Sequence, residues 1–291
     1  APGLSREDDK HETMKSAETI PVIRISPPRG WTALQLNTLW PYRELLYFFV
    51  WRELKVRYRQ TLLGALWIVL QPVVSMVVFS VLFGRLLGVP SGDIPYPLFA
   101  YAALLPWNYF ASSLNRSSTS LVSNAHLLTK VYFPRLLLPI AAVLSGLVDF
   151  GIAFLVFIGL VFYYGVTLQL TILLLPAFLL LAMLTALAFG LWLTALNVRF
   201  RDVNYIIPYL IQVWMYATPV IYGSTLIPER FRFLLALNPM TGVVEGFRWA
   251  LLGQGSAPGP ILAVSAAIVL ALLVSGLYFF RQMERSFADV V

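Results

Sequence analysis

The segment Trp51–Arg59 concentrates side chains that can bind phosphate groups. Its positive charges are Arg52, Lys55, Arg57 and Arg59. Arginine can hold phosphate oxygens with two parallel hydrogen bonds, whereas lysine offers a point charge. An apolar run, Leu62–Leu82, follows, and this order is typical of a chain that lies on the cytoplasmic face of a membrane before crossing it. The four side chains could bind an incoming phosphate, or only attract anionic lipid at about 1 kcal/mol per basic residue.

A second set of polar side chains repeats at helical spacing in a later apolar stretch. Its members are Tyr205, Tyr209, Gln212 and Tyr216. Spacings of four, three and four residues place them on one face of a helix. Aromatic rings with hydrogen-bonding tips suit sugar rings, whose faces are apolar and whose edges are polar. We expect this stripe to line a pore, with ordinary packing as the alternative, and we expect Gln71 and Ser75 to lie on the opposing wall.

The sequence carries no pattern for hydrolysis or phosphoryl transfer. The motifs GxxxxGK[ST] and HExxH are absent, as is cysteine, and the histidines are His11 and His126. The predicted spans hold one acid near mid-membrane, Asp149, which could carry protons. Since no relay partner accompanies it, we favour a structural ion pair with Arg116. We predict that the chain is no enzyme, has no catalytic or metal site and binds no cofactor, so a partner or an ion gradient must drive active transport.

The segment 124–135, NAHLLTKVYFPR, reads as a short amphipathic helix. Four apolar or aromatic side chains share its face, and Pro134 stops it. The residues that could contact a partner are Asn124, His126, Leu127, Leu128, Lys130, Val131, Phe133, Pro134 and Arg135. The helix could rest on lipid headgroups or insert into a groove of a cytosolic protein, and the residues alone leave both possibilities open.

Composition indicates which elements must position these side chains. The chain of 291 residues is 12% charged, with mean hydropathy +0.76, whereas a soluble domain carries roughly 25% charged residues. We therefore predict an all-α integral membrane protein with six transmembrane helices, an N-terminal amphipathic interface helix and short re-entrant outer helices before the last span. The predicted spans are 62–87, 98–120, 136–164, 170–196, 204–222 and 260–280.

Basic residues predict the orientation. With both termini in the cytosol, twelve arginines and lysines flank the inner side and four the outer side, as the positive-inside rule requires. The inner ones are Arg43, Arg52, Lys55, Arg57, Arg59, Arg116, Lys130, Arg135, Arg199, Arg201, Arg281 and Arg285, and the outer ones are Arg85, Arg230, Arg232 and Arg248. We expect a multi-pass protein of a bacterial inner membrane.

The predicted organisation has four parts. A polar cytosolic tail, 1–39, without an apolar signal sequence, precedes the interface helix, 40–61. The permease domain, 62–285, and a short cytosolic tail, 286–291, follow. Within the domain, the connection 223–257 holds two short apolar runs broken by proline or glycine, and we expect it to dip into the outer interface. Glu245 and Arg248, at i, i+3 in the second run, suit a short helix with a paired charge. The alternative is a surface loop with one amphipathic helix.

Several segments, in order, resemble the ABC-transporter permeases of the polysaccharide export family. They are RELKVRYRQTLLGALWIVLQP before and within the first span, NAHLLTKVYFPRLLLP, NVRFRDV, and LNPMTGVVEGFRWALLG near the last span. The resemblance runs from about Trp40 to Arg285 and leaves out the 1–39 tail. It implies a homodimer of six-span subunits with two ATP-binding cassette subunits, which bind ATP and Mg.

The resemblance also implies a cargo and a use for the residues above. The cargo would be a lipid-linked polysaccharide, and O antigen is the preferred candidate. Capsule, teichoic acid and a small lipid or drug are the alternative cargoes. A transporter driven by an ion gradient is the less favoured class of protein. Segment 124–135 would couple to the ATPase, and the basic residues of Trp51–Arg59 would lie where a diphosphate-linked lipid enters. The pore would form between two copies, and no nucleic acid is involved.

Overall fold

The computed structural model describes residues 39–59, 64–128, 130–228, 230, 232–254 and 259–284. Regular structure in these residues is helical, with no strand among them. The predicted tails 1–39 (apart from its last residue) and 286–291 lie outside the described residues, as do 60–63 and parts of 223–257.

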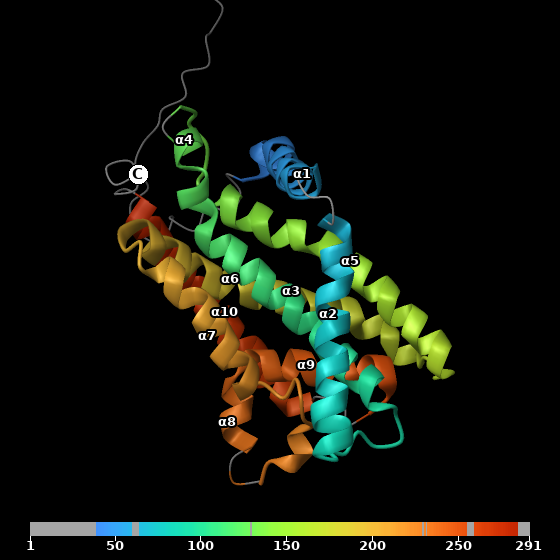
Figure 1. Ribbon diagram of the computed structural model, residues 1–291. Helices are drawn as coiled ribbons and strands as arrows, with labels where there is room; N and C mark the ends of the chain where they lie inside the picture. Colours follow the sequence, from blue (N-terminus) through green and yellow to red (C-terminus); the bar gives the residue numbers. More distant parts are fainter. Residues whose placement is uncertain are drawn as a thin grey trace, which may run out of the picture. The chain divides into compact units, whose positions relative to one another are not determined.

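The helices divide into long and short ones. The long ones are α2 (Gly64–Phe79) with its π-helical continuation η5 (Ser80–Leu86), α3 (Tyr96–Ser123), α5 (Leu137–Tyr164), α6 (Leu175–Arg199), preceded by η6 (Leu170–Leu174), and α10 (Gly259–Glu284). The short ones are η4 (Trp40–Tyr42), α1 (Arg43–Arg59), α4 (Ala125–Leu128), α7 (Val203–Ala217), η7 (Ser224–Leu226), α8 (Arg232–Leu237) and α9 (Pro239–Leu252). We call the end that carries α1 and α4 the inner end and the end that carries α8 the outer end (Figure 1).

Helix α3 lies at the centre of the bundle, packed against α2, α5, α6, α7 and α9 (Figure 1). Small residues let its neighbours approach closely. A Cβ added at Gly190 of α6 would collide with the Ser117 hydroxyl, and Thr194 Oγ1 donates a hydrogen bond to the Ser117 carbonyl at 2.7 Å. The outer half of α3 is buried almost all round, whereas part of its inner half is uncovered.

Four helical segments have the length and composition to cross a membrane, which confirms the all-helical membrane class. They are Leu66–Leu86, Leu137–Tyr164, Leu170–Arg199 and Ile261–Glu284, matching the first, third, fourth and sixth predicted spans. Helix α3 has 28 residues but many polar ones in its inner half. Helix α7 has 15 residues and ends at Ala217, so the predicted end of that span at 222 is wrong. Six spans remain a prediction.

The outer connection forms helices α8 and α9, and α9 lies in the core rather than on the surface. Helix α9 packs against α3, α6 and α10, with twelve of its residues buried. The Asn238 side chain caps its first turn by accepting from Met240 N at 3.1 Å, and the helix ends at Gly253, whose φ of 66° suits glycine. The burial of α9 does not fit a surface loop with one amphipathic helix.

The expected pair between Glu245 and Arg248 is wrong. The Arg248 guanidinium donates instead to the carbonyls of Pro219, Val220 and Tyr222, and its Cζ lies 3.7 Å from the centre of the Phe99 ring. Buried arginine needs acceptors, and the turns after α7 offer three free carbonyls that α9 brings within reach. Arg248 thereby joins the end of α7 to the core.

Candidate functional site

The tyrosine stripe of α7 faces away from its own chain. Ile207, Ile211 and Trp214 point into the core, where Trp214 packs edge-on against Phe110 and Phe189. The stripe occupies the opposite side of the helix. Its exposed fractions are 82% for Tyr205, 68% for Tyr209 and 56% for Tyr216, and Gln212 is exposed as well. Ordinary packing within one chain therefore does not account for the stripe.

Within one chain, the predicted opposing wall on the first span meets only the outer end of the stripe, at Tyr216. Helix α2 packs against α3 and α5, whereas α7 packs against α3 and α6. The two helices stand apart towards the inner end and approach each other towards the outer end (Figure 1). There a hollow of about 310 Å³ lies between them, lined by Phe83 and Leu87 on one side and Tyr216 and Tyr222 on the other. Gln71 is exposed and Ser75 half-buried.

An apolar groove of about 620 Å³ flanks the stripe between α6 and α7. Its lining is Phe189, Ile206, Tyr209, Leu210, Val213, Trp214 and Ala217. These side chains present little that can form hydrogen bonds. The two sides of α7 therefore differ in chemistry, because the groove suits lipid or another apolar surface and the stripe suits a partly polar one.

The four basic residues of Trp51–Arg59, in α1, separate into two pairs. Arg57 and Arg52 are half-buried and engaged inside the protein, Arg57 with Asp149 at 2.5 Å and Arg52 with the side chain of Asn124. Lys55 and Arg59 are exposed, with the Lys55 ammonium over the ring of Trp51. The prediction that Arg52 and Arg57 bind a ligand phosphate therefore conflicts with their contacts here. Lys55 and Arg59 are the members of the set that face outward.

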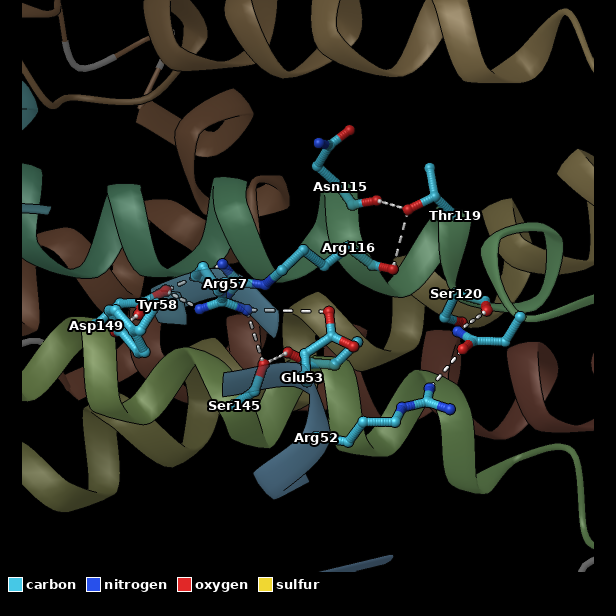
Figure 2. Close-up of polar contacts among 12 residues, drawn as sticks. Arg52, Glu53, Arg57, Tyr58, Asn115, Arg116, Thr119, Ser120, Ser145 and Asp149 are labelled. Atoms are coloured by element: carbon cyan, nitrogen blue, oxygen red, sulfur yellow. Dashed lines mark hydrogen bonds and ion pairs between the residues drawn. The ribbon is translucent and has the colours of Figure 1, made fainter. Parts of the chain in front are cut away.

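Asp149 is the centre of a cluster that joins α1, α3 and α5 (Figure 2). The expected contact with Arg116 is present, with Arg116 Nη1 3.0 Å from Asp149 Oδ2. Arg57 reaches the same oxygen, and the Tyr58 hydroxyl donates to Asp149 Oδ1 at 2.6 Å. Arg57 also donates to Ser145 at 3.2 Å. Burial, followed by the hydrogen bond to Asp149, raises the pKa of Tyr58 to about 12, so the phenol keeps its proton and remains a donor.

Segment 124–135 is only partly helical. Helix α4 is a single turn, Lys130 lies in a turn, and 131–134 have no regular secondary structure. A residue before proline is biased away from helical geometry, which fits a helix that does not continue to Pro134. The predicted single apolar face is therefore wrong. Tyr132 is 80% exposed, whereas the next residue, Phe133, is 5% exposed and packs on Phe49 of α1, with ring centroids 5.2 Å apart.

The same segment is tied to α1 at one end and to α10 at the other. Asn124 accepts from Arg52 of α1 and donates to the Ser120 carbonyl at 2.7 Å. Arg135 Nη1 donates to the Glu284 carbonyl at 2.7 Å at the end of α10. Leu127 and Leu128 pack partly into the inner core, and His126 and Lys130 are exposed. A hollow of about 210 Å³, lined by residues that include Leu128, Lys130 and Tyr132, marks the outward side of the segment.

Sequence reasoning missed two members of this network. Tyr58 follows Arg57 directly and was not distinguished from its neighbours, and Ser145 lies one helical turn before Asp149. The second spacing was a usable signal, because residues at i and i+4 share a helix face. Nothing local connected Tyr58 to a residue 91 positions away.

The architecture defines a helical integral membrane protein, and comparison with known proteins gives its family. The chain belongs to the ABC-2 type transporter family, whose model matches residues 44–252. It is 34% identical to the O-antigen export system permease protein RfbA of Myxococcus xanthus, over 88% of this chain and 98% of that protein. It is 28% identical to the Klebsiella pneumoniae protein of the same name, over 85% and 95%, and 26% identical to the polysialic acid transport protein KpsM of Escherichia coli, over 81% and 92%.

Proposed function

We propose that this chain is the transmembrane subunit of an ATP-driven exporter that moves polysaccharide, with O antigen as the first candidate, across the bacterial inner membrane. The observation that carries the proposal is the 34% identity to an O-antigen export permease over almost the whole length of both proteins. As an ABC-2 family member, the chain is the membrane component. ATP and Mg are bound by two separate ATP-binding cassette subunits.

The conduit forms between two copies of this chain. The tyrosine stripe supports this arrangement, since the described part of its own subunit leaves most of the stripe without an opposing wall, and Tyr216 alone shares a hollow with the first span. A second copy would provide that wall, with Gln71 and Ser75 of the first span among its polar positions. A polymer must slide through many registers, and aromatic faces bind sugar rings without a fixed register. Six spans with both termini in the cytosol complete the topology.

The ATPase subunit docks on segment 124–135. Its outward side chains include Val131 and Tyr132, whereas Phe133 and Arg135 hold the segment to α1 and α10. This division of roles supports a docking surface with an anchored base. The diphosphate of the lipid carrier enters beside Lys55 and Arg59, two exposed basic residues of α1.

A capsule-type acidic polymer is the second candidate cargo, because the chain is also similar to KpsM, a polysialic acid transport protein. Teichoic acid and small lipids or drugs are further alternatives. An ion-gradient-driven mechanism is less favoured, because Asp149 is held by two arginines and a tyrosine.

The test is reconstitution with the ATPase encoded beside the gene. The pair should co-purify, restore O antigen to the surface of a strain that lacks the gene, and hydrolyse ATP faster when lipid-linked O antigen is added. Val131→Asp should uncouple hydrolysis from export without loss of folded protein, while Leu155→Asn, on an exposed part of α5 far from the segment, serves as the control for a polar change. Failure of wild-type protein to restore surface polymer would refute the proposed cargo, and unimpaired coupling in Val131→Asp would refute the docking site.

A further inference from the structure

The side-chain amides inside the predicted spans are not spread evenly over the helices. They are Gln71, Asn108, Asn115, Asn204 and Gln212. All five lie on α2, α3 or α7, and the predicted spans on α5, α6 and α10 contain no asparagine or glutamine. Helices α6 and α10 carry Asn197 and Gln282 only beyond the predicted ends of their spans. Within the spans, the amides therefore gather on three of the six helices.

Two of the amides lie on α3 and have no hydrogen-bond partner among the residues that the structure describes. They belong to a strip that we call the amide face, made of Asn108, Ser112, Asn115 and Thr119. Ser112 and Thr119 satisfy their hydroxyls on carbonyls of their own helix, at 3.2 Å and 3.1 Å. The side chain of Asn115 is exposed, and that of Asn108 is half-exposed. An amide without a partner in lipid is costly, so a face that keeps two of them is expected to meet water or a polar ligand.

The position of the amide face fits an entry section for such a ligand. Asn108 lies near the middle of α3, and Ser112, Asn115 and Thr119 lie in its inner half. The inner half of α3 is visible between α2 and α7, where these helices stand apart (Figure 1). Towards the outer end the same side of α3 is buried, and α2 with η5 meets the end of α7. The open section therefore begins on the side of α1 and ends before the outer surface.

The chemistry of the amide face favours a neutral, hydroxyl-rich sugar chain as its ligand. Each amide can donate and accept, and none of the four side chains carries charge. The neighbouring charge, Arg116, is turned to Asp149, whereas the Asn115 amide points away from that cluster (Figure 2). Asn108 and Asn115 are seven residues apart, about 10 Å along the helix. A sugar chain that moves along α3 can therefore release the hydrogen bond to one amide and form one to the next.

We infer that the amide face of α3 forms a wall of the conduit in its inner half and binds the hydroxyl groups of the sugar chain as it enters. This inference rests on the proposed function. It places the second span in the conduit wall, where only the first and fifth spans were expected. The conduit then has an inner section lined by amides, and the tyrosine stripe continues from this section towards the outer end. A rival occupant is a second copy of this chain, since asparagines can also join helices within a membrane.

The chain lacks cysteine, so single Asn108→Cys and Asn115→Cys variants can be probed without background. The matched control is Leu155→Cys on α5, which is 70% exposed but lies in an apolar stretch. In the assembled transporter in nanodiscs, a membrane-impermeant maleimide should label both asparagine positions and leave position 155 unlabelled. Lipid-linked O antigen should slow labelling at 115 several-fold.

Three results would overturn the inference. They are no labelling at 108 and 115 in any nucleotide state, a disulfide between two copies at position 115 on oxidation, and labelling that the polymer does not slow. Export by the wild-type complex is measured alongside. If the wild type does not export polymer, the proposed function fails; if it does, the three results above bear on the amide face alone. As a second readout, Asn115→Leu should reduce export with the ATPase still bound, and Asn115→Gln should retain more of it.

Discussion

The Asp149 cluster makes a quantitative prediction about the attachment of α1 to the bundle. The carboxylate receives Arg57 at 2.5 Å, Tyr58 at 2.6 Å and Arg116 at 3.0 Å. Asp149→Asn keeps the shape of the side chain but removes the negative charge. Two guanidinium groups then face each other across a site in which the side chains of Asp149 and Arg116 are only 16% and 19% exposed.

The magnitude follows from the cost of an unpaired buried charge. Breaking a buried pair by removing one partner costs about 3 to 5 kcal/mol. The cluster is partly exposed, and Arg57 can turn towards Glu53, which is 4.0 Å away. We therefore take the lower end, about 3 kcal/mol, which corresponds to a fall in Tm of about 6 to 12 °C for a domain of roughly this size.

The assay is thermal unfolding of purified protein in detergent, followed by the fluorescence of the eight tryptophans. Asp93→Asn, in the exposed loop between η5 and α3, is the control and should leave Tm unchanged. Adding Arg116→Met to Asp149→Asn should recover part of the loss, because one of the two opposed charges is removed. A Tm for Asp149→Asn within about 2 °C of wild type, or no recovery in the double variant, would show that the cluster does not hold α1 in place.

Three further predictions concern burial and exposure. Tyr209→Ala should lower export while changing the free energy of unfolding by less than about 0.5 kcal/mol, because its side chain packs on little of its own subunit; a large loss of stability would contradict this. Phe133→Ala should destabilise the protein by about 3 to 5 kcal/mol in chemical denaturation, whereas Tyr132→Ala should be near neutral; equal effects would contradict the assigned burial. Gly190→Leu should cost about 1 to 3 kcal/mol by forcing α6 from α3 at Ser117, and unchanged thermal stability would show that the contact can relax.

Several properties could be read from the sequence because they depend on neighbouring residues. Hydropathy summed along the chain located four spans to within four residues at each end. Helical periodicity placed Tyr205, Tyr209 and Tyr216 on one face of α7. The prolines and glycines of 223–257 correctly indicated two short helices, α8 and α9.

Local pattern failed where a side chain had a choice of partners. Arg57 was grouped with Lys55 and Arg59 as a ligand-binding cation, but it pairs with a residue 92 positions away. Arg248 has an acid one turn before it, yet it donates to three carbonyls at the end of α7. In segment 124–135, the irregular backbone before Pro134 places Phe133 inward and Tyr132 outward, a division that the predicted single apolar face did not include.

The sequence by itself determined that this protein is a helical membrane protein with a basic inner segment and a polar-aromatic stripe, since composition and periodicity are local quantities. Only the tertiary structure decided what each face meets. The packing of α3 against five other helices buries its outer half and leaves the amide face open. The packing of α7 on α3 and α6 turns the tyrosine stripe away from its own chain. Periodicity tells which residues share a face, but the neighbour of that face is set by helices that are far apart in the chain.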